Sequence, residues 1–139
     1  MSTKHLLLVD DSTDDLELAK RLIMKVVPGV VVTCAEDGIR ALALLHAPEG
    51  QRLVPDLILL DYRMPRMDGA DVLRALRADE GTRHMPVVIV SSSNERGDLR
   101  RCYELGANSY VRKPVNFSHY ESALKLIVQY WLGINERPE

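Results

Sequence analysis

The fold is decided by the stretch Asp56-Leu57-Ile58-Leu59-Leu60-Asp61-Tyr62-Arg63-Met64-Pro65. Four consecutive apolar residues lie between two carboxylates, a pattern typical of a buried central strand in a parallel sheet. A buried helix could give the same short run, but Pro55 and Pro65 leave no room for a helix of ordinary length. Asp61 is therefore predicted at the carboxyl end of a strand, where open α/β sheets bind their ligands.

The composition limits the classes of protein to consider. With 139 residues, the chain can form one domain whose core needs no disulfide or structural metal. Lys and Arg total 18 against 20 Asp and Glu, so no basic excess favours nucleic acid or a membrane surface. The start of the chain lacks an apolar signal region, and no stretch approaches the roughly 18 apolar residues of a membrane span. We expect a cytoplasmic protein in which Cys34 and Cys102 are buried thiols.

The rest of the chain alternates between short apolar runs and segments with helical periodicity. Each predicted helix starts near cap or turn residues and each predicted strand is short. Five strands alternating with five helices imply right-handed crossovers and a doubly wound parallel sheet, with the strand order left open. The predicted strands cover residues 6–9, 30–35, 57–60, 87–90 and 109–111, and the last predicted helix covers residues 117–132.

Polar residues follow four of these strands and should meet at one edge of the sheet. They are Asp10 and Asp11, Asp61, Ser91, and Lys113. Three carboxylates at one site repel each other unless a cation neutralises them, and an all-oxygen ligand set favours Mg²⁺ or Mn²⁺. An Asp beside such cations can act as a nucleophile in phosphoryl transfer, with Lys113 as a second cation and the Ser91 hydroxyl as a donor.

Each of these residues also has an ordinary structural explanation. Asp10 and Asp11 could simply begin a helix, Asp61 could cap a turn, and Ser91 could belong to a loop. We favour a catalytic site over separate structural roles, because all of these residues fall at strand ends on one edge of the sheet. Chance would rarely place all of them there together.

In combination, these residues resemble the receiver domains of two-component response regulators, from His5 to about Trp131. The resemblance implies a single receiver domain over residues 1–139, with a flavodoxin-like receiver fold, strand order 2-1-3-4-5 and a cis bond before Pro114. The features that carry it are Asp10-Asp11, Ala35-Glu36-Asp37-Gly38 with Ala41, Asp61 with Met64-Pro65-Arg66-Met67-Asp68-Gly69, Ser91, Tyr110 and Lys113-Pro114.

The resemblance also implies residue roles. Asp61 would be the phosphoacceptor, taking a phosphoryl group from a phosphohistidine of a partner histidine kinase. Mg²⁺ or Mn²⁺ would be bound by Asp11, Asp61 and the backbone carbonyl of Arg63, with Asp10 acting through water. Enzyme activity would be limited to the protein's own phosphorylation and dephosphorylation.

The remaining implied roles concern switching. Lys113 would pair with the phosphate, while Ser91 would swing towards it and Tyr110 would turn inward, reshaping the surface of the fourth helix, fifth strand and fifth helix. Arg63 and Ser93 lie two residues after Asp61 and Ser91, at positions that in this family tune the lifetime of the aspartyl-phosphate.

A narrower resemblance is to the single-domain regulators associated with bacterial phytochromes, which implies a bacteriophytochrome kinase as partner. It is carried by the loop 48–55, the serine-rich stretch 91–93, Lys113-Pro114-Val115 and Tyr130-Trp131-Leu132. In the last helix, a core stripe is predicted, and further apolar residues around its side predict either a wide core or a homodimer surface. The stripe comprises Phe117, Tyr120, Leu124, Ile127 and Trp131, and the extension comprises Ala123, Leu126 and Tyr130.

Three alternatives remain open at this point. A phosphorelay intermediate would pass its phosphoryl group to another protein. A phosphatase of the aspartyl-phosphate type would need an acid two residues after the nucleophile, where this chain has Arg63. A flavodoxin-like nucleotide binder would want phosphate-binding amides after the first strand, where Asp10 and Asp11 would repel a phosphate.

Overall fold

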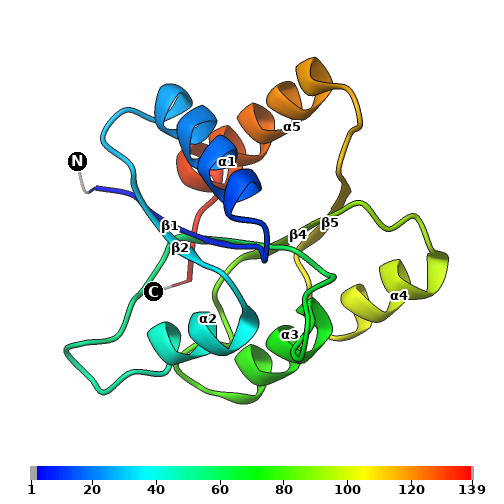
Figure 1. Ribbon diagram of the computed structural model, residues 1–139. Coiled ribbons are helices and arrows are strands. Elements are labelled where there is room, and N and C mark those ends of the chain that lie inside the picture. Colours follow the sequence, from blue (N-terminus) through cyan, green and yellow to red (C-terminus); the bar gives the residue numbers. More distant parts are fainter. Residues whose placement is uncertain (1–2, 139) are drawn as a thin grey trace.

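The computed structural model describes residues 3–138 as a five-stranded parallel sheet between two layers of helices (Figure 1). The strand order is β2-β1-β3-β4-β5, which confirms the predicted doubly wound fold. Helices α1 and α5 cover one face, and α2, α3 and α4 cover the other. The strands are β1 (His5–Val9), β2 (Val31–Ala35), β3 (Leu57–Leu60), β4 (Val87–Ser91) and β5 (Ser109–Arg112).

The helices begin close to the predicted cap residues. Ser12 caps α1 by accepting a hydrogen bond from the backbone N–H of Asp15, and Asp37 caps α2 in the same way. Asp68 and Asp71 form a reciprocal capping box at the start of α3. The helices are α1 (Thr13–Val26), α2 (Gly38–Leu45), α3 (Gly69–Ala78), α4 (Arg96–Glu104) and α5 (Phe117–Gln129), followed by a π-helical turn, η1 (Tyr130–Ile134).

The central strand β3 is buried on both faces, as its uninterrupted apolar run predicts. Leu57 and Leu59 pack with the residues under α1 and α5, whereas Ile58 and Leu60 pack with the residues under α2, α3 and α4. Because successive side chains point to opposite faces of the sheet, this one strand contributes to both core layers. Asp56 and Asp61, which flank β3, therefore lie at the amino and carboxyl edges of the sheet, respectively.

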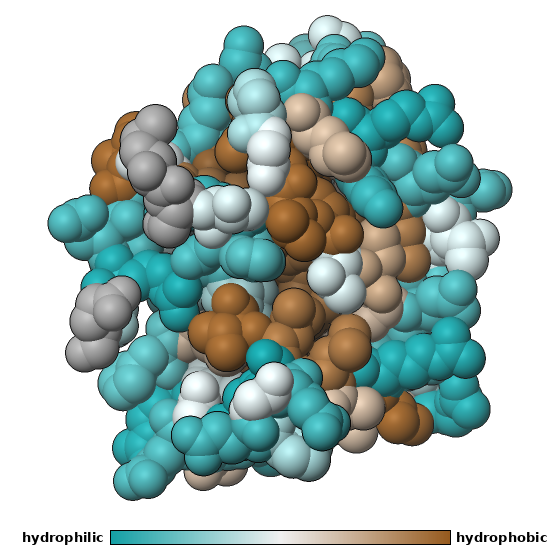
Figure 2. Space-filling model, turned by 90° about the vertical axis from the view of Figure 1, so that its left-hand side faces the viewer, coloured by the Kyte–Doolittle hydropathy of each residue, from teal (hydrophilic) through white to brown (hydrophobic). Residues whose placement is uncertain are grey.

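The acid in front of β3 has a structural role. The carboxylate of Asp56 accepts a hydrogen bond from the backbone N–H of His5 at 2.8 Å and pairs with Arg137 at 2.7 Å. It thereby ties the beginning of β1 and the C-terminal segment to the amino edge of the sheet. Figure 2 faces this side of the molecule, where apolar side chains gather at the centre.

The prediction for the last helix is partly wrong. Its core-facing residues are Tyr120, Leu124, Val128 and Leu132, spaced four apart, while Phe117 is 54% exposed. Ile127 and Trp131 lie at the edge of this stripe and are only partly buried. The reason is geometric: α5 packs along α1, and the side chains four residues apart from Tyr120 onward are the ones that reach the core.

Two further expectations are wrong. Cys34 is exposed, because β2 is an edge strand with only one neighbour, whereas Cys102 is fully buried as expected. Among residues 3–138 there is no cis peptide bond, so the bond before Pro114 is trans, the form that X–Pro bonds intrinsically favour. Within the same residues, none of the helices combines the length and apolar character that a membrane crossing requires.

Candidate acidic site at the carboxyl edge of the sheet

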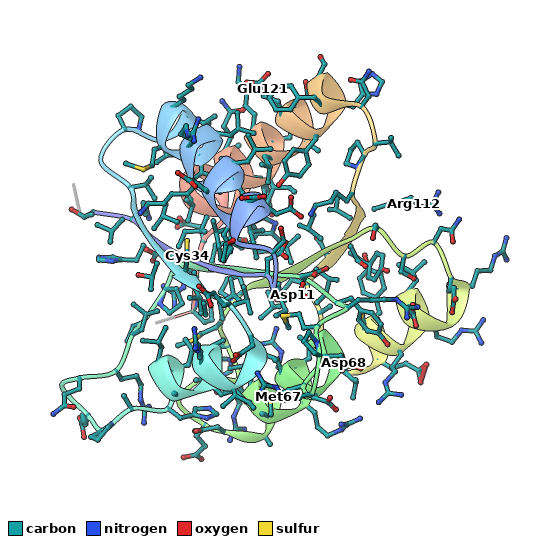
Figure 3. The ribbon with its side chains drawn as sticks, viewed as in Figure 1. Asp11, Cys34, Met67, Asp68, Arg112 and Glu121 are labelled. Atoms are coloured by element: carbon teal, nitrogen blue, oxygen red, sulfur yellow. The ribbon has the colours of Figure 1, made fainter. Side chains whose placement is uncertain are left out.

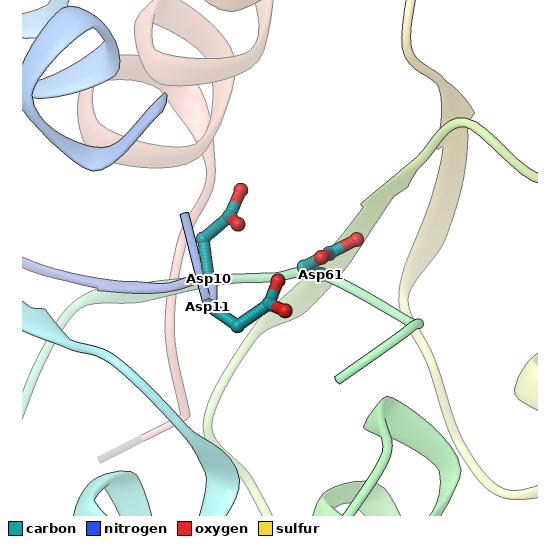
Figure 4. Close-up of side chains that lie close together, drawn as sticks. All are labelled: Asp10, Asp11 and Asp61. Atoms are coloured by element: carbon teal, nitrogen blue, oxygen red, sulfur yellow. The ribbon is translucent and has the colours of Figure 1, made fainter. Parts of the chain in front are cut away.

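Three carboxylates meet at the carboxyl edge of the sheet, as predicted (Figure 4). Each of Asp10, Asp11 and Asp61 offers an oxygen that lies within 4.8 Å of the others'. Asp10 and Asp11 follow β1, and Figure 3 shows Asp11 on the loop that leads to α1. Asp61 follows β3, and its backbone N–H donates to the carbonyl of Val9 at 2.9 Å. Adjacent parallel strands therefore bring residues 50 positions apart into one cluster.

The site is electrostatically unfavourable without a cation. Burial, together with the neighbouring charges of Asp10 and Asp11, raises the pKa of Asp61 to about 7, although Lys113 opposes them. Burial also raises the pKa of Asp10, although a hydrogen bond from the backbone N–H of Ser12 to its Oδ1 favours the charged form. The negative charge at this edge is therefore only partly compensated by the protein itself.

The donor set fits a hard divalent cation. Oxygen ligands of Mg²⁺ lie at about 2.0–2.1 Å from the ion, so two of its ligands are separated by about 3–4 Å. The carboxylate oxygens lie within 4.8 Å of one another, which is close enough for small side-chain rotations to bring them around one ion. The absence of His and Cys from the cluster fits Mg²⁺ or Mn²⁺ better than zinc.

Lys113 reaches the cluster from the end of β5. Its Nζ lies 3.1 Å from the Oδ2 of Asp15 and 3.7 Å from that of Asp10, and it lies over the ring of Tyr120. Burial tends to lower the pKa of Lys113, but the two carboxylates outweigh it and the pKa is raised. Asp15 was not predicted as part of the site. The available signal was the acidic first turn of α1, which closely follows Asp10 and Asp11 and contains Asp15.

Ser91 and Tyr110 are connected through one residue. Ser91 is 1% exposed, and its Oγ accepts a hydrogen bond from the backbone N–H of Ser93 at 3.1 Å. The hydroxyl of half-buried Tyr110 donates to the carbonyl of the same Ser93 at 3.1 Å. The loop between β4 and α4 therefore joins the two residues predicted to switch.

The side chain of Arg63 is engaged with α4. Its Nη2 lies 3.0 Å from the Oδ2 of Asp98 and 3.7 Å from the Oε1 of Glu95. Sequence reasoning left open whether this guanidinium screens the acidic cluster, and it did not identify Asp98. No pattern in the sequence signals this contact, since the two residues are 35 positions apart.

The loop after Asp61 is held close to α3 by Gly69. Its backbone N–H donates to the carbonyl of Tyr62 at 2.8 Å. A Cβ at this position would lie 2.9 Å from both the carbonyl oxygen of Asp61 and the Cα of Tyr62. Both are backbone atoms, so neither can rotate away.

Replacing Gly69 by Ala is therefore expected to displace the backbone of Asp61. We expect a loss of about 2–3 kcal/mol in the free energy of unfolding, the range of overpacking substitutions, together with weaker Mg²⁺ binding. Urea denaturation and a Mg²⁺ titration measure the two effects. Gly97→Ala is the control, because its Cβ would meet nothing within 4 Å and Ala favours the helix. Equal stabilities of the two variants would contradict the close approach.

Residues 6–125 match the family profile of the response regulator receiver domain. The chain belongs to this family. Receiver domains are the phosphoryl-accepting modules of two-component signalling and bind Mg²⁺ or Mn²⁺ at their acidic pocket, which in this receiver domain corresponds to the cluster described above.

Several relatives resemble this receiver domain over nearly its whole length. The probable methanogenesis regulatory protein FilR2 of Methanothrix harundinacea is 36% identical over 96% of this chain and 86% of its own. The phosphorylated cyanobacterial phytochrome response regulator RcpA is 31% identical, with a TM-score of 0.92 over 99% of this chain and 100% of its own.

Two further solved structures bear on the cation and the signal. The Mn²⁺-bound form of the response regulator Rcp1 is 29% identical, with a TM-score of 0.84, over 98% of this chain and 99% of its own. The bacteriophytochrome response regulator AtBRR is 34% identical, with a TM-score of 0.73, over 100% of this chain and 99% of its own. Phytochrome response regulators are thus among the structural neighbours of this receiver domain.

Proposed function

We propose that this chain acts as a single receiver domain, residues 1–139, that accepts a phosphoryl group on Asp61 from a partner histidine kinase. The observation that carries the proposal is the convergence of Asp10, Asp11 and Asp61 at one edge of the sheet, with Lys113 beside them. A half-buried carboxylate flanked by two others and by one ammonium group suits a nucleophile in a cation-assisted phosphoryl transfer.

In the proposed reaction, a carboxylate oxygen of Asp61 attacks phosphorus while the bond to the phosphohistidine nitrogen breaks. The histidine leaves as imidazole, and the protein carries an acyl phosphate. Asp11, Asp61 and the backbone carbonyl of Arg63 would hold Mg²⁺ or Mn²⁺, with Asp10 bound to it through water. The ion supplies positive charge that offsets the charge developing on the transferred phosphoryl oxygens.

The remaining roles follow from position. The Nζ of Lys113 would give up one of its ion pairs, with Asp15 or Asp10, and bind a phosphoryl oxygen. The Ser91 hydroxyl would donate a hydrogen bond to a second phosphoryl oxygen. Tyr110 would then turn inward, because both residues are hydrogen-bonded to Ser93. The output is then a changed surface on α4, β5 and α5, so the protein acts as a regulator and not as an enzyme on other substrates.

We further propose that the kinase is a light-sensing bacteriophytochrome and that both proteins work in the cytoplasm. The likeness to RcpA and AtBRR, over nearly the full length of each, supports the choice of kinase. We expect an autophosphorylated, purified bacteriophytochrome to transfer its phosphoryl group to this chain within minutes. The transfer should be faster than from an unrelated histidine kinase. Equal rates from both kinases would count against it.

A homodimer through α5 is proposed as well. The exposed apolar side chains along its length favour it, because large apolar patches on a surface usually mark interfaces. Light scattering at tens of micromolar, with and without beryllofluoride, is expected to show a dimer, and monomer under both conditions would contradict it. The exposed side chains are Leu126 of α5 and Tyr130 of η1, which are four residues apart, and Phe117 at the start of α5.

Phosphoryl acceptance is tested by intact-mass measurement after incubation with acetyl phosphate and Mg²⁺. We expect a gain of about 80 Da, the mass of one phosphoryl group, which disappears in Asp61→Asn and in EDTA. Asp14→Asn is the matched control, since it removes an exposed carboxylate from the first turn of α1 and should leave the gain intact. The same gain in Asp61→Asn would overturn the assignment of the nucleophile.

A further inference from the structure

Asp98, near the start of α4, gathers donors from two different loops. Its Oδ2 accepts hydrogen bonds from the Oγ of Ser93 at 2.5 Å and from the Nη2 of Arg63 at 3.0 Å. Only 15% of the Asp98 side chain is exposed, so these contacts are shielded from much of the solvent. One carboxylate thus connects the loop after Asp61 with the loop after β4.

Ser93 extends this connection to the two switch residues. Its hydroxyl donates to Asp98, its backbone N–H donates to the Oγ of Ser91, and its carbonyl accepts from the hydroxyl of Tyr110. All three of its polar groups are therefore occupied by different partners. By holding the Ser93 hydroxyl, Asp98 restrains this residue, and with it the carbonyl to which Tyr110 is bound.

The helix that carries Asp98 has few other anchors. Cys102 is the only residue of α4 that is buried, and Leu99 and Tyr103 are exposed. The N-cap residue Glu95 makes no side-chain hydrogen bond to the helix. Besides buried Cys102, α4 is held by the contacts of Asp98 near its first turn and by the hydrogen bond from the backbone N–H of Tyr110 to the Tyr103 hydroxyl at 3.0 Å.

We infer that Asp98 is a positioning residue that fixes the β4–α4 loop for Tyr110 and holds Arg63 away from Asp61. Through Ser93 it sets the carbonyl that Tyr110 binds, and through Arg63 it links that loop to the phosphoacceptor loop. The part that concerns the lifetime of the aspartyl-phosphate rests on the proposed function. The part that concerns Tyr110 does not, since it rests on the hydrogen bonds of Ser93 to Asp98 and Tyr110.

The first test uses protein labelled with 3-fluorotyrosine, in which Tyr110→Phe assigns the fluorine resonance of Tyr110. Asp98→Ala is expected to move this resonance towards that of an exposed tyrosine, whereas Asp98→Asn, which still accepts from Ser93, should keep it near its original position. Ser93→Ala should reproduce the shift of Asp98→Ala and serves as a second variant should that one fold poorly. Glu95→Gln is the matched control, because Glu95 pairs with Arg63 but has no contact with Tyr110.

An unchanged Tyr110 resonance in both Asp98→Ala and Ser93→Ala overturns the inference. So does a shift of equal size in Glu95→Gln, because a general change of charge at α4 would then explain it. Neither result touches phosphoryl acceptance, which the mass measurement tests separately. The two failures are therefore distinguishable.

The second test measures the half-life of the phosphorylated protein. Released from Asp98, the guanidinium of Arg63 can turn towards the phosphoryl group and offset its charge, so Asp98→Ala is expected to lengthen the half-life about threefold, the effect of one partly exposed ion pair. In an Arg63→Met background the same substitution should have no effect. An equal lengthening in both backgrounds would show that Asp98 does not act through Arg63.

Discussion

Replacing Asp61 by Asn is expected to stabilise the metal-free protein at pH 8. The substitution removes the most strongly perturbed of three clustered carboxylates while keeping the shape of the side chain. Burial and the charges of Asp10 and Asp11 raise its pKa to about 7 from 3.8 in the unfolded chain. A shift of this size corresponds to roughly 4 kcal/mol, and partial exposure reduces the expected gain to about 1–2 kcal/mol.

The pH dependence of this gain has a definite sign. Below pH 4, Asp61 is protonated in both states and costs the fold nothing. Between pH 4 and pH 7 the unfolded chain ionises first, so the folded state loses stability as pH rises, and above pH 7 the full penalty applies. The difference in free energy of unfolding between Asp61→Asn and the original protein should therefore grow from pH 4 to pH 7 and then level off.

Magnesium should remove most of this difference. An ion at tenfold its dissociation constant stabilises the folded state by about 1.4 kcal/mol. The original protein should gain this in thermal unfolding experiments, while Asp61→Asn should gain much less because it lacks one charged ligand. Asp14→Asn, an exposed carboxylate outside the cluster, should show neither the metal-free stabilisation nor the loss of response. Identical behaviour of both variants would mean that net charge alone governs stability.

The second large effect is expected at Arg77, on α3. Its guanidinium donates to the carbonyls of Gly106, Arg83 and Met85 at 2.8–3.0 Å, and to the Oδ1 of Asn108 at 2.9 Å. These partners lie before β4 and before β5, so one side chain connects α3 to the beginnings of both strands. Burial lowers the pKa of Arg77, which is the cost of placing this charge among carbonyls.

Arg77→Met should lower the free energy of unfolding by about 2–4 kcal/mol, because it leaves partly buried carbonyls without donors. Arg77→Lys should recover little of this, since an ammonium group cannot reproduce the forked geometry of a guanidinium. Urea denaturation measures both. The control is Arg74→Met on the same helix, whose one ion pair, to Asp71 at 3.4 Å, is exposed. Its loss should stay below about 0.5 kcal/mol, and comparable losses at the two positions would contradict the proposed role.

The predicted elements and most of the site were accessible from sequence because their signals are local. The apolar run of residues 57–60 predicts a strand buried on both faces, and the change to Asp61 marks its end. Once the strands are parallel, their carboxyl ends must meet, so the clustering of Asp10 and Asp11 with Asp61 required no further information. The family resemblance added the strand order, which local patterns leave open.

The sequence by itself thus determined the alternation of strands and helices, the acidic cluster and the family. Only the tertiary structure decided that Asp98 receives Arg63 and Ser93, and that Lys113 contacts Asp15, 98 residues away. It also decided that Phe117 and Cys34 are exposed. Apolar periodicity and strand ends are encoded within a few residues. By contrast, the partner of a long charged side chain, and the exposure of a residue at an edge, depend on which distant segments pack beside it.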